Sequence, residues 1–179
     1  MQIKNHNIFP IQVHTIQSDI DTTPIKELIE SWTSILDVDG FHYGEGTGGL
    51  QGGGEIIENV AFDEFHKTLN TTIPKLYRKG YNIISKWISI YNKGDYNKIH
   101  NHPTPQYLNS ELVSGIFYIQ TEPNDSKLVI HSHQNVGDTE EFDPNEGDII
   151  LFRSSTYHSV TPKKFDSKRI CLAFNLKLN

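Results

Sequence analysis

From residue 82 to its end the sequence consists of short β-branched and aromatic runs separated by turn residues. These runs cover residues 82–92, 112–120, 127–133, 147–154, 158–162 and 169–178. Several short strands at regular spacing are typical of an antiparallel sandwich or barrel, whereas a parallel α/β sheet would alternate strands with helices. The pattern predicts a mainly β fold, and any chemistry has to be placed on that scaffold.

The first half of the chain carries two helical patterns. Residues 23–37 place apolar side chains on one helical stripe, with Thr23 as the expected N-cap and Pro24 in the first turn. Residues 61–79 show a second stripe, with Pro74 as an expected kink and Gly80 as the expected end. We therefore expect helices to flank the β-rich part on its N-terminal side.

A glycine-rich segment, residues 40–55, separates the two helical patterns. Its GEGTGG stretch matches the dinucleotide-binding spacing G-x-G-x-x-G, but no β-branched strand precedes it and no strand–helix repeat follows. Without that context the motif is weak, and the segment is interpreted as a flexible loop or lid.

Length and composition limit the protein classes to consider. A chain of 179 residues suits one domain, with a helical flank over about 1–81 and a barrel core over about 82–179. Cys171 is the single cysteine, which excludes an internal disulfide and suits a reducing, cytoplasmic compartment. No apolar run is long enough to cross a bilayer, and no signal peptide is recognisable. The formal charge of −6 disfavours nucleic acid as a partner, and the oligomeric state stays open.

Histidines are concentrated in the β-rich part, where His100 with His102 and His131 with His133 form two H-x-H pairs. Because side chains alternate with period two along a strand, both imidazoles of such a pair can bind one metal ion. His158, at the end of a buried-looking strand, could supply a third ligand. The alternative for the first pair is a polar turn closed by Pro103.

Arg169 opens the last expected strand and shares one face with Cys171, Ala173 and Asn175. A buried arginine on such a face needs an anionic partner, because its planar fork offers two parallel hydrogen bonds to a carboxylate. The alternative is a surface ion pair with Asp166. Tyr118 is either a pocket residue or part of the barrel core.

Several motifs occur in a characteristic order over residues 82–179. They are H-x-H, the SGIFYIQ strand, P-x-x-G-D-I-I-L-F followed by H-S-V-T-P, and K-R-I-C-L-A-F-N. In order and spacing the chain resembles the bacterial and phage 2-oxoglutarate/Fe(II)-dependent oxygenases, distant relatives of prolyl hydroxylases.

The resemblance implies a double-stranded β-helix, a jelly-roll or cupin-like barrel with flanking N-terminal helices, that binds Fe(II) at its mouth. His100 and His158 match two iron ligands, and His102 stands where most relatives carry a carboxylate. Arg169 and Tyr118 match the residues that hold the distal carboxylate of the cosubstrate 2-oxoglutarate. Tyr91 and Asn175 are further candidates for the cosubstrate pocket.

The function implied is that of a dioxygenase that hydroxylates a protein side chain or small molecule with O2 and releases succinate and CO2. The alternatives are a cupin-like metal enzyme that does not use 2-oxoglutarate and a non-catalytic jelly-roll binding module. Substrate contacts are expected from residues near the barrel mouth, namely Arg153, His131 and His133. For His131 and His133 a second metal pair or a solvated face is the alternative, and for Arg153 a salt bridge at the rim.

Overall fold

The computed structural model describes residues 1–8, 11–35, 41–43, 49–102, 112–133 and 137–179, which form two antiparallel sheets. In order across the large sheet, its strands are β1 (Gln2–Ile8), β2 (Ile11–Gln17), β10 (Ile149–Arg153), β7 (Leu112–Gln120), β12 (Arg169–Leu178), β5 (Tyr81–Tyr91), β4 (Leu50–Gly52) and β3 (Phe41–Tyr43). The small sheet has the order β6 (Asn97–His100), β11 (His158–Val160), β8 (Leu128–His131) and β9 (Thr139–Phe142).

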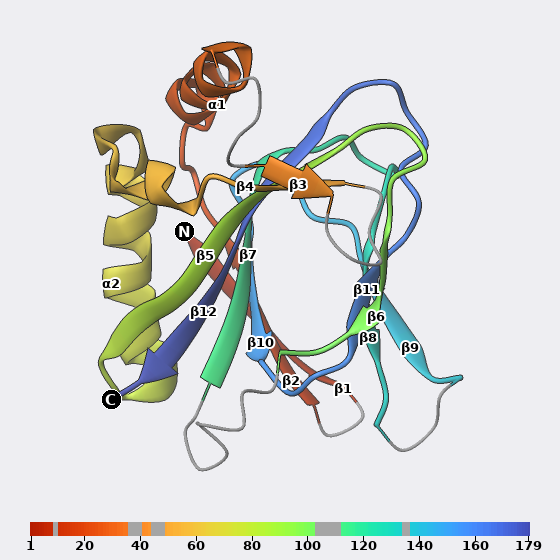
Figure 1. Cartoon of the computed structure of the whole chain (residues 1–179). Coiled ribbons are helices and arrows are strands. Elements are labelled where there is room, and N and C mark those ends of the chain that lie inside the picture. Colours follow the sequence, from red (N-terminus) through yellow and green to blue (C-terminus); the bar gives the residue numbers. More distant parts are fainter. Residues whose placement is uncertain (9–10, 36–40, 44–48, 103–111, 134–136) are drawn as a thin grey trace.

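From β5 onward the chain crosses repeatedly between the two sheets, with β8 and β9 as a consecutive pair in the small sheet. Strands β5, β7, β10 and β12 lie in the large sheet, and β6, β8, β9 and β11 lie in the small sheet that faces it (Figure 1). This alternation of antiparallel strands between two facing sheets is a jelly roll. The predicted mainly β barrel, a double-stranded β-helix, is therefore confirmed.

Two α-helices cover the outer face of the large sheet (Figure 1). They are α1 (Thr23–Ile35) and α2 (Asp63–Tyr77), and the short 3₁₀ turns η1 (Gly54–Glu58) and η2 (Val60–Phe62) precede α2. Neither helix, within the part of the chain described, has the length and apolar character of a membrane span.

The ends of both helices differ from the expected ones. The Asp21 carboxylate accepts a hydrogen bond from the N–H of Thr23 at 3.0 Å, so Asp21, not Thr23, satisfies the start of α1. Helix α2 continues past Pro74 to Tyr77 and ends at Arg78, whose φ of 55° is left-handed. The expected stop at Gly80 was therefore two residues late, because Arg78 itself adopts the conformation that usually favours glycine.

The N-terminal flank is not only helical, which corrects the expectation for residues 1–81. Strands β1 and β2 form a hairpin, and β2 extends the large sheet by pairing with β10, with Ile16 opposite Ile149. The glycine-rich segment contributes β3 and β4, which pair with each other and attach to β5. Most of the GEGTGG stretch lies outside the described residues.

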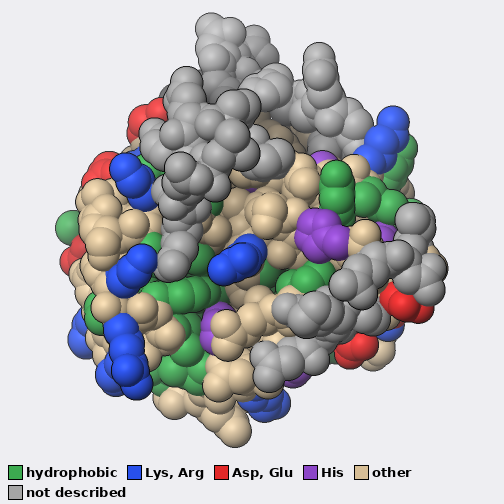
Figure 2. Space-filling model, turned by 90° about the horizontal axis from the view of Figure 1, so that it is seen from below, with side chains coloured by type: hydrophobic (Ala, Val, Ile, Leu, Met, Phe, Trp, Pro, Cys, Tyr) green, Lys and Arg blue, Asp and Glu red, His purple; other side chains and the backbone are tan. Residues whose placement is uncertain are grey.

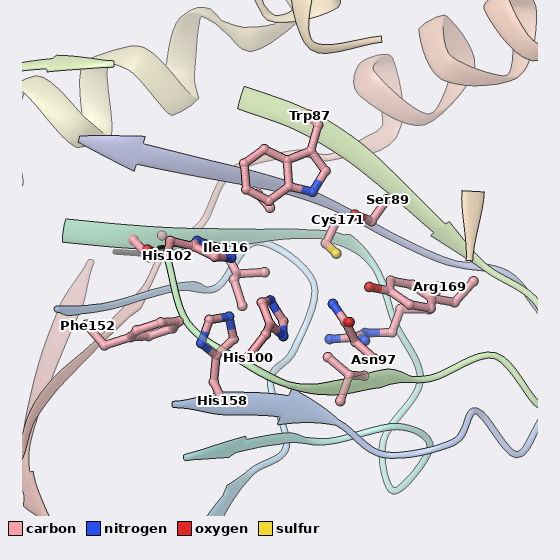
Figure 3. A pocket seen from close by; sticks show the side chains of 15 residues that line it. Trp87, Ser89, Asn97, His100, His102, Ile116, Phe152, His158, Arg169 and Cys171 are labelled. Carbon is pink, nitrogen blue, oxygen red and sulfur yellow. Dashed lines mark hydrogen bonds between the residues drawn. The ribbon is translucent and has the colours of Figure 1, made fainter. Parts of the chain in front are cut away.

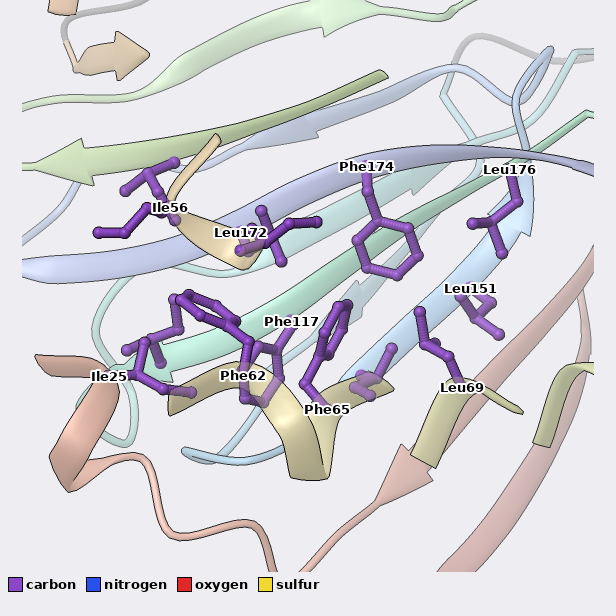
Figure 4. Packing of buried hydrophobic residues seen from close by; sticks show 14 of the residues in the cluster. Ile25, Ile56, Phe62, Phe65, Leu69, Phe117, Leu151, Leu172, Phe174 and Leu176 are labelled. Atoms are coloured by element: carbon purple, nitrogen blue, oxygen red, sulfur yellow. The ribbon is translucent and has the colours of Figure 1, made fainter. Parts of the chain in front are cut away.

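The large sheet buries both of its faces, and β12 shows how. Ile170, Leu172, Phe174 and Leu176 point toward the helices, whereas Cys171 belongs to a second cluster inside the barrel. Figure 4 shows the helix side, where Phe65 of α2 stacks on Phe117 with ring centroids 5.0 Å apart. The alternation of strand side chains thus leaves the interior face free to carry a polar site.

Gly115 in β7 is required by this packing. A Cβ added to it would lie 2.2 Å from the Phe174 ring, closer than side-chain atoms can approach. The glycine in the SGIFYIQ strand therefore makes room for a large aromatic side chain on the neighbouring strand, β12.

One ion pair, between Asp125 and Lys163, is completely buried. Lys163 Nζ lies 2.5 Å from Asp125 Oδ2, and both side chains have no exposed surface. Asp125 Oδ1 also accepts hydrogen bonds from the backbone N–H groups of Lys164 and Phe165, at 2.6 and 3.2 Å. The carboxylate therefore connects the β7–β8 turn to the segment that leads into β12.

Replacing Asp125 by alanine is expected to lower the free energy of unfolding by about 3–5 kcal/mol, because it leaves the buried Lys163 ammonium without its oppositely charged partner. Burial raises the pKa of Asp125, but the hydrogen bonds from Lys163 and the backbone outweigh it, so the pKa lies below its ordinary 3.8. The stabilisation is therefore present above pH 3.8 and lost as the pH falls through the folded-state pKa. Urea unfolding at neutral pH checks the magnitude, with Glu64→Ala, which removes an exposed pair with Lys67, as the control expected to change little.

Candidate metal and cosubstrate site

Three histidines converge between the two sheets. His100 is the last residue of β6 and lies opposite His158, the first residue of β11. His102 follows two residues after β6 ends, where its N–H donates to the carbonyl of Ser154 at 2.7 Å. One potential ligand atom from each imidazole lies within 4.8 Å of the others. Residues distant in sequence thus form one cluster of metal-ligand type.

Hydrogen bonds to backbone carbonyls orient the imidazole rings of His100 and His158. His100 Nδ1 lies 2.7 Å from the carbonyl of Lys98, and His158 Nδ1 lies 3.0 Å from the carbonyl of Thr156. A carbonyl oxygen only accepts, so in both rings Nδ1 carries the proton and the lone pair is on Nε2. This arrangement is the usual support of a metal-binding histidine.

The buried histidines are neutral at physiological pH. Burial lowers the pKa of His158 to about 3, and His100 adds to the effect. Burial also lowers the pKa of His102, and the hydrogen bond with Asn175 opposes this only partly. Because a metal ion needs the deprotonated imidazole, these two residues can bind it without first losing a proton.

Arg169 lies at the other end of the same pocket. Its side chain is 1% exposed, and none of its guanidinium nitrogens has a hydrogen-bond partner among the residues that the structure describes. The guanidinium carbon lies 5.2 Å from the ring centre of Tyr91 and 5.3 Å from that of Tyr118. The rings favour a cation, but they leave five N–H donors without an acceptor.

The alternative interpretation of Arg169, a surface ion pair with Asp166, is wrong. Asp166 is exposed, and its Oδ1 lies 3.2 Å from Lys93 Nζ instead. Arg169 is the first residue of β12 and pairs with Tyr91 of β5, so it is held inside the barrel.

Tyr118 is also buried with an unused polar group. Its side chain has no exposed surface, and its hydroxyl has no hydrogen-bond partner within the described ranges. Burial raises the pKa of Tyr118 above its ordinary value, and burial raises the pKa of Tyr91 to about 12. Tyr118 therefore keeps its proton, and its O–H is an available donor beside Arg169.

A single pocket connects the two ends. In Figure 3 the three histidines lie at one end and Arg169 at the other, with Asn97 and Cys171 between them. The strand register explains this: Arg169 pairs with Tyr91, Cys171 with Ser89 and Ala173 with Trp87, and all of these line the pocket. Among the described residues that line the pocket there is no Asp or Glu.

The remaining sequence candidates lie elsewhere. His131 bonds Ser159 through Nε2 at 2.8 Å, and His133 is exposed with its ring beside Tyr157. Within the described residues neither joins the cluster of His100, His102 and His158. Arg153 follows Leu151 and Ile149 on the helix side of β10 and does not line the pocket. Burial raises the pKa of Tyr77 there, and the charge of Arg153 offsets this only in part. Asn175 also does not line the pocket; its amide contacts His102 and Ser85.

Sequence reasoning missed several pocket residues. Trp87 and Phe152 have the composition of core residues, but both line the pocket, and Trp87 packs edge-on against His102 at 5.6 Å. Ser89 and Asn97 line it as well. The available signal was the period of two along β5, which places Trp87, Ser89 and Tyr91 on one face.

The face shown in Figure 2 is not dominated by acidic groups, although the net charge is −6. Histidine side chains reach the surface near its middle, and basic side chains lie at its centre and on one side. Acidic side chains appear only toward the margin.

These residues fit both Fe(II) and 2-oxoglutarate. Three imidazoles within reach of one another are suitable ligands for a divalent transition metal. The buried guanidinium and the Tyr118 hydroxyl, both without partners among described residues, fit one carboxylate of a dicarboxylate. A histidine cluster at one end of a jelly-roll pocket and a buried arginine at the other match the class of metal-dependent oxygenases that use 2-oxoglutarate.

The comparison with protein families agrees with this class. A family model described as "Putative 2OG-Fe(II) oxygenase" matches residues 85–175, half of the chain. The chain belongs to this family, as the motif order predicted, and is therefore an oxidoreductase that uses Fe(II), 2-oxoglutarate and O2. No curated protein matches the chain in sequence.

Solved structures show the same fold at low sequence identity. HygX from Streptomyces hygroscopicus, with nickel and 2-oxoglutarate bound, is 10% identical with a TM-score of 0.66, covering 92% of this chain and 82% of that chain. A prolyl-4-hydroxylase from Pseudomonas putida is 15% identical with a TM-score of 0.65, covering 99% and 91%. The viral collagen prolyl hydroxylase of Paramecium bursaria Chlorella virus-1, as a 2-oxoglutarate complex, is 15% identical with a TM-score of 0.60, covering 92% and 95%.

Proposed function

We propose that His100, His102 and His158 bind the iron, that Arg169 and Tyr118 bind the distal carboxylate of 2-oxoglutarate, and that the enzyme hydroxylates its substrate. The observation that carries the proposal is the buried, unpaired guanidinium in the same pocket as the histidine cluster. An isolated buried charge costs several kcal/mol, so an anionic ligand is expected to occupy this end of the pocket. Hydroxylation would consume one O2 and one 2-oxoglutarate per C–H bond and yield the alcohol, succinate and CO2.

The protein side chains perform binding and positioning. Arg169 offers two parallel N–H groups to a carboxylate, and Tyr118 can donate a third hydrogen bond from its O–H. The rings of Tyr91 and Tyr118 hold the guanidinium in place and exclude water from it. When bound, iron and 2-oxoglutarate supply the activation of O2 and the oxidising power.

The three imidazoles are neutral ligands, which sets the charge of the site. A carboxylate at position 102 would cancel one positive charge of Fe(II), whereas His102 does not. The metal end of the pocket therefore keeps a full double positive charge, and the Arg169 end adds one more. Both ends attract a dianionic cosubstrate, and this matches the lack of carboxylates in the pocket lining.

We propose that the substrate is a small molecule or a protein side chain. The residues considered as substrate contacts, Arg153, His131 and His133, do not line the pocket. The structurally similar HygX has been solved with hygromycin B bound and two other neighbours are prolyl hydroxylases, so the fold accommodates both kinds of substrate.

The proposed activity is tested without knowledge of the substrate. With Fe(II), 2-oxoglutarate and O2, the purified protein is expected to form succinate slowly, and omission of any one component is expected to abolish it. Succinate is measured by chromatography. Metal binding without any dependence of O2 consumption on 2-oxoglutarate would favour a cupin-like enzyme and contradict the proposal.

A further inference from the structure

One row of polar side chains crosses the large sheet beside His102. The strand register places Ser85 of β5, Asn175 of β12 and Ser114 of β7 opposite one another. Asn175 Nδ2 donates to Ser85 Oγ at 2.7 Å, and Ser114 Oγ donates to Asn175 Oδ1 at 2.6 Å. Ser114 is also hydrogen-bonded to Ser154 at 2.9 Å. The amide of Asn175 is therefore held from both sides.

This row ends on the imidazole of His102. His102 Nδ1 lies 3.1 Å from Asn175 Oδ1 and 3.2 Å from Ser114 Oγ. Because Asn175 Nδ2 is engaged with Ser85, the oxygen of the amide faces the ring and accepts the Nδ1 proton. His102 is then left with its lone pair on Nε2, which is the form that a metal ion requires.

His102 differs from the other two histidines of the cluster in this respect. His100 and His158 are supported by backbone carbonyls only two residues away, which any sequence would supply. His102 lies beyond the end of β6 and is supported by a side chain 73 residues away in sequence. The β-bulge directly after Asn175, where Leu176 pairs with Ile83, locally changes the pairing with β5 next to this contact.

We infer that Asn175 is a positioning residue for the metal site, which holds His102 in its tautomer and orientation, and is not a contact of 2-oxoglutarate. The inference rests on the proposed role of His102 as a metal ligand. Its physical basis is the hydrogen bond from a ligand histidine to an outer acceptor, whose loss typically lowers metal affinity by about 10–100-fold. Asn175 therefore acts on the metal through His102.

The test compares metal binding by two Asn175 variants. Asn175→Ala removes the acceptor and is expected to weaken binding of Co(II), used as a stable stand-in for Fe(II), by about 10–100-fold. Asn175→Asp keeps an acceptor oxygen toward Nδ1 and is expected to bind Co(II) as tightly as the parent chain. Affinity is measured by calorimetry, and the visible spectrum of the Co(II) complex reports the ligand set.

Controls separate positioning from simple loss of structure. Asn82→Ala, which removes an exposed amide contact with Asn179 elsewhere on β5, is expected to leave Co(II) affinity unchanged. Thermal unfolding of the metal-free variants shows whether each is folded. Equal weakening by Asn175→Asp and Asn175→Ala, or no weakening by either, would overturn the inference. If His102→Ala also leaves the affinity unchanged, the fault lies instead in the proposed ligand set.

Discussion

Replacing Arg169 by methionine is expected to weaken binding of 2-oxoglutarate by at least about 30-fold while leaving the metal-free protein as stable as the parent, or more stable. The affinity for 2-oxoglutarate falls because its carboxylate loses a buried, charged partner, which typically costs about 2–5 kcal/mol of binding free energy. A cost of about 1.4 kcal/mol corresponds to a tenfold weaker affinity. The gain in stability follows because the guanidinium is 1% exposed and unpaired among described residues, so a flexible apolar side chain of similar length replaces an uncompensated charge.

Two measurements check this expectation. Calorimetric titration of the metal-loaded protein gives the affinity for 2-oxoglutarate, and urea unfolding of the metal-free protein gives the stability. Arg169→Lys serves as the matched variant, because it keeps the charge but lacks the planar fork and is expected to bind with intermediate affinity. Unchanged 2-oxoglutarate affinity in Arg169→Met, or a parallel loss of metal affinity, would contradict the assignment of Arg169 to the distal carboxylate.

Replacing His158 by alanine is expected to lower metal affinity by more than about 100-fold, because loss of even an outer hydrogen-bond partner of a ligand costs about 10–100-fold. Of the three histidines, His158 has the most constrained position. It is 4% exposed, lies opposite His100 on the neighbouring strand β6, and bonds the Thr156 carbonyl through Nδ1. With Nδ1 bonded to the Thr156 carbonyl, Nε2 is the ring nitrogen of His158 that is left to bind a metal ion.

The matched control for this variant is His131→Ala. His131 lies on β8, next to β11 in the small sheet, and is hydrogen-bonded to Ser159, but it is outside the metal cluster. Equilibrium dialysis with Co(II) is expected to give the parent affinity for His131→Ala and no measurable site for His158→Ala. Similar affinities for the two variants would show that the metal does not bind at the three histidines.

The strand pattern predicted the barrel well because it depends on local properties. Strands β7, β10 and β12 are rich in β-branched and aromatic residues and bounded by turns, so their place and type could be found without partners. Strand β9, with the sequence TEEF, was not predicted, because it is mostly exposed and has no apolar run. It forms a strand because it pairs with β8, and its own residues do not indicate this pairing.

The hairpin of β1 and β2 shows a second limit. In β2 the residues Val13 to Ile16 are all buried, because the strand lies between β1 and β10 and is covered on both faces. The polar residues His14 and Thr15 are therefore buried beside Val13 and Ile16, and only the pairing of β2 with β10, over 130 residues later, explains this pattern. Long-range pairing of this kind has no local signature.

Some residues of the candidate site could be predicted from local sequence motifs, whereas others depend on contacts between strands that are distant in sequence. The H-x-H spacing, the histidine after the GDIILF strand and the arginine that opens the last strand are local features, and the structure brings these four residues to one pocket. The role of Asn175 could not be read in this way, because its contact with His102 depends on the register of three strands. Its face on β12 was predictable from the period of two, but its partner was not.

The most direct test of the central claim is an anaerobic titration of the Fe(II)-loaded protein with 2-oxoglutarate, followed by visible absorption. If the histidine cluster and Arg169 form the two ends of one cosubstrate pocket, a metal-to-ligand charge-transfer band appears and saturates at one 2-oxoglutarate per chain. The account predicts that the band is lost in His158→Ala and shifts to much higher 2-oxoglutarate concentration in Arg169→Met. Fe(II) binding by the parent chain with no such band at saturating 2-oxoglutarate would contradict the account.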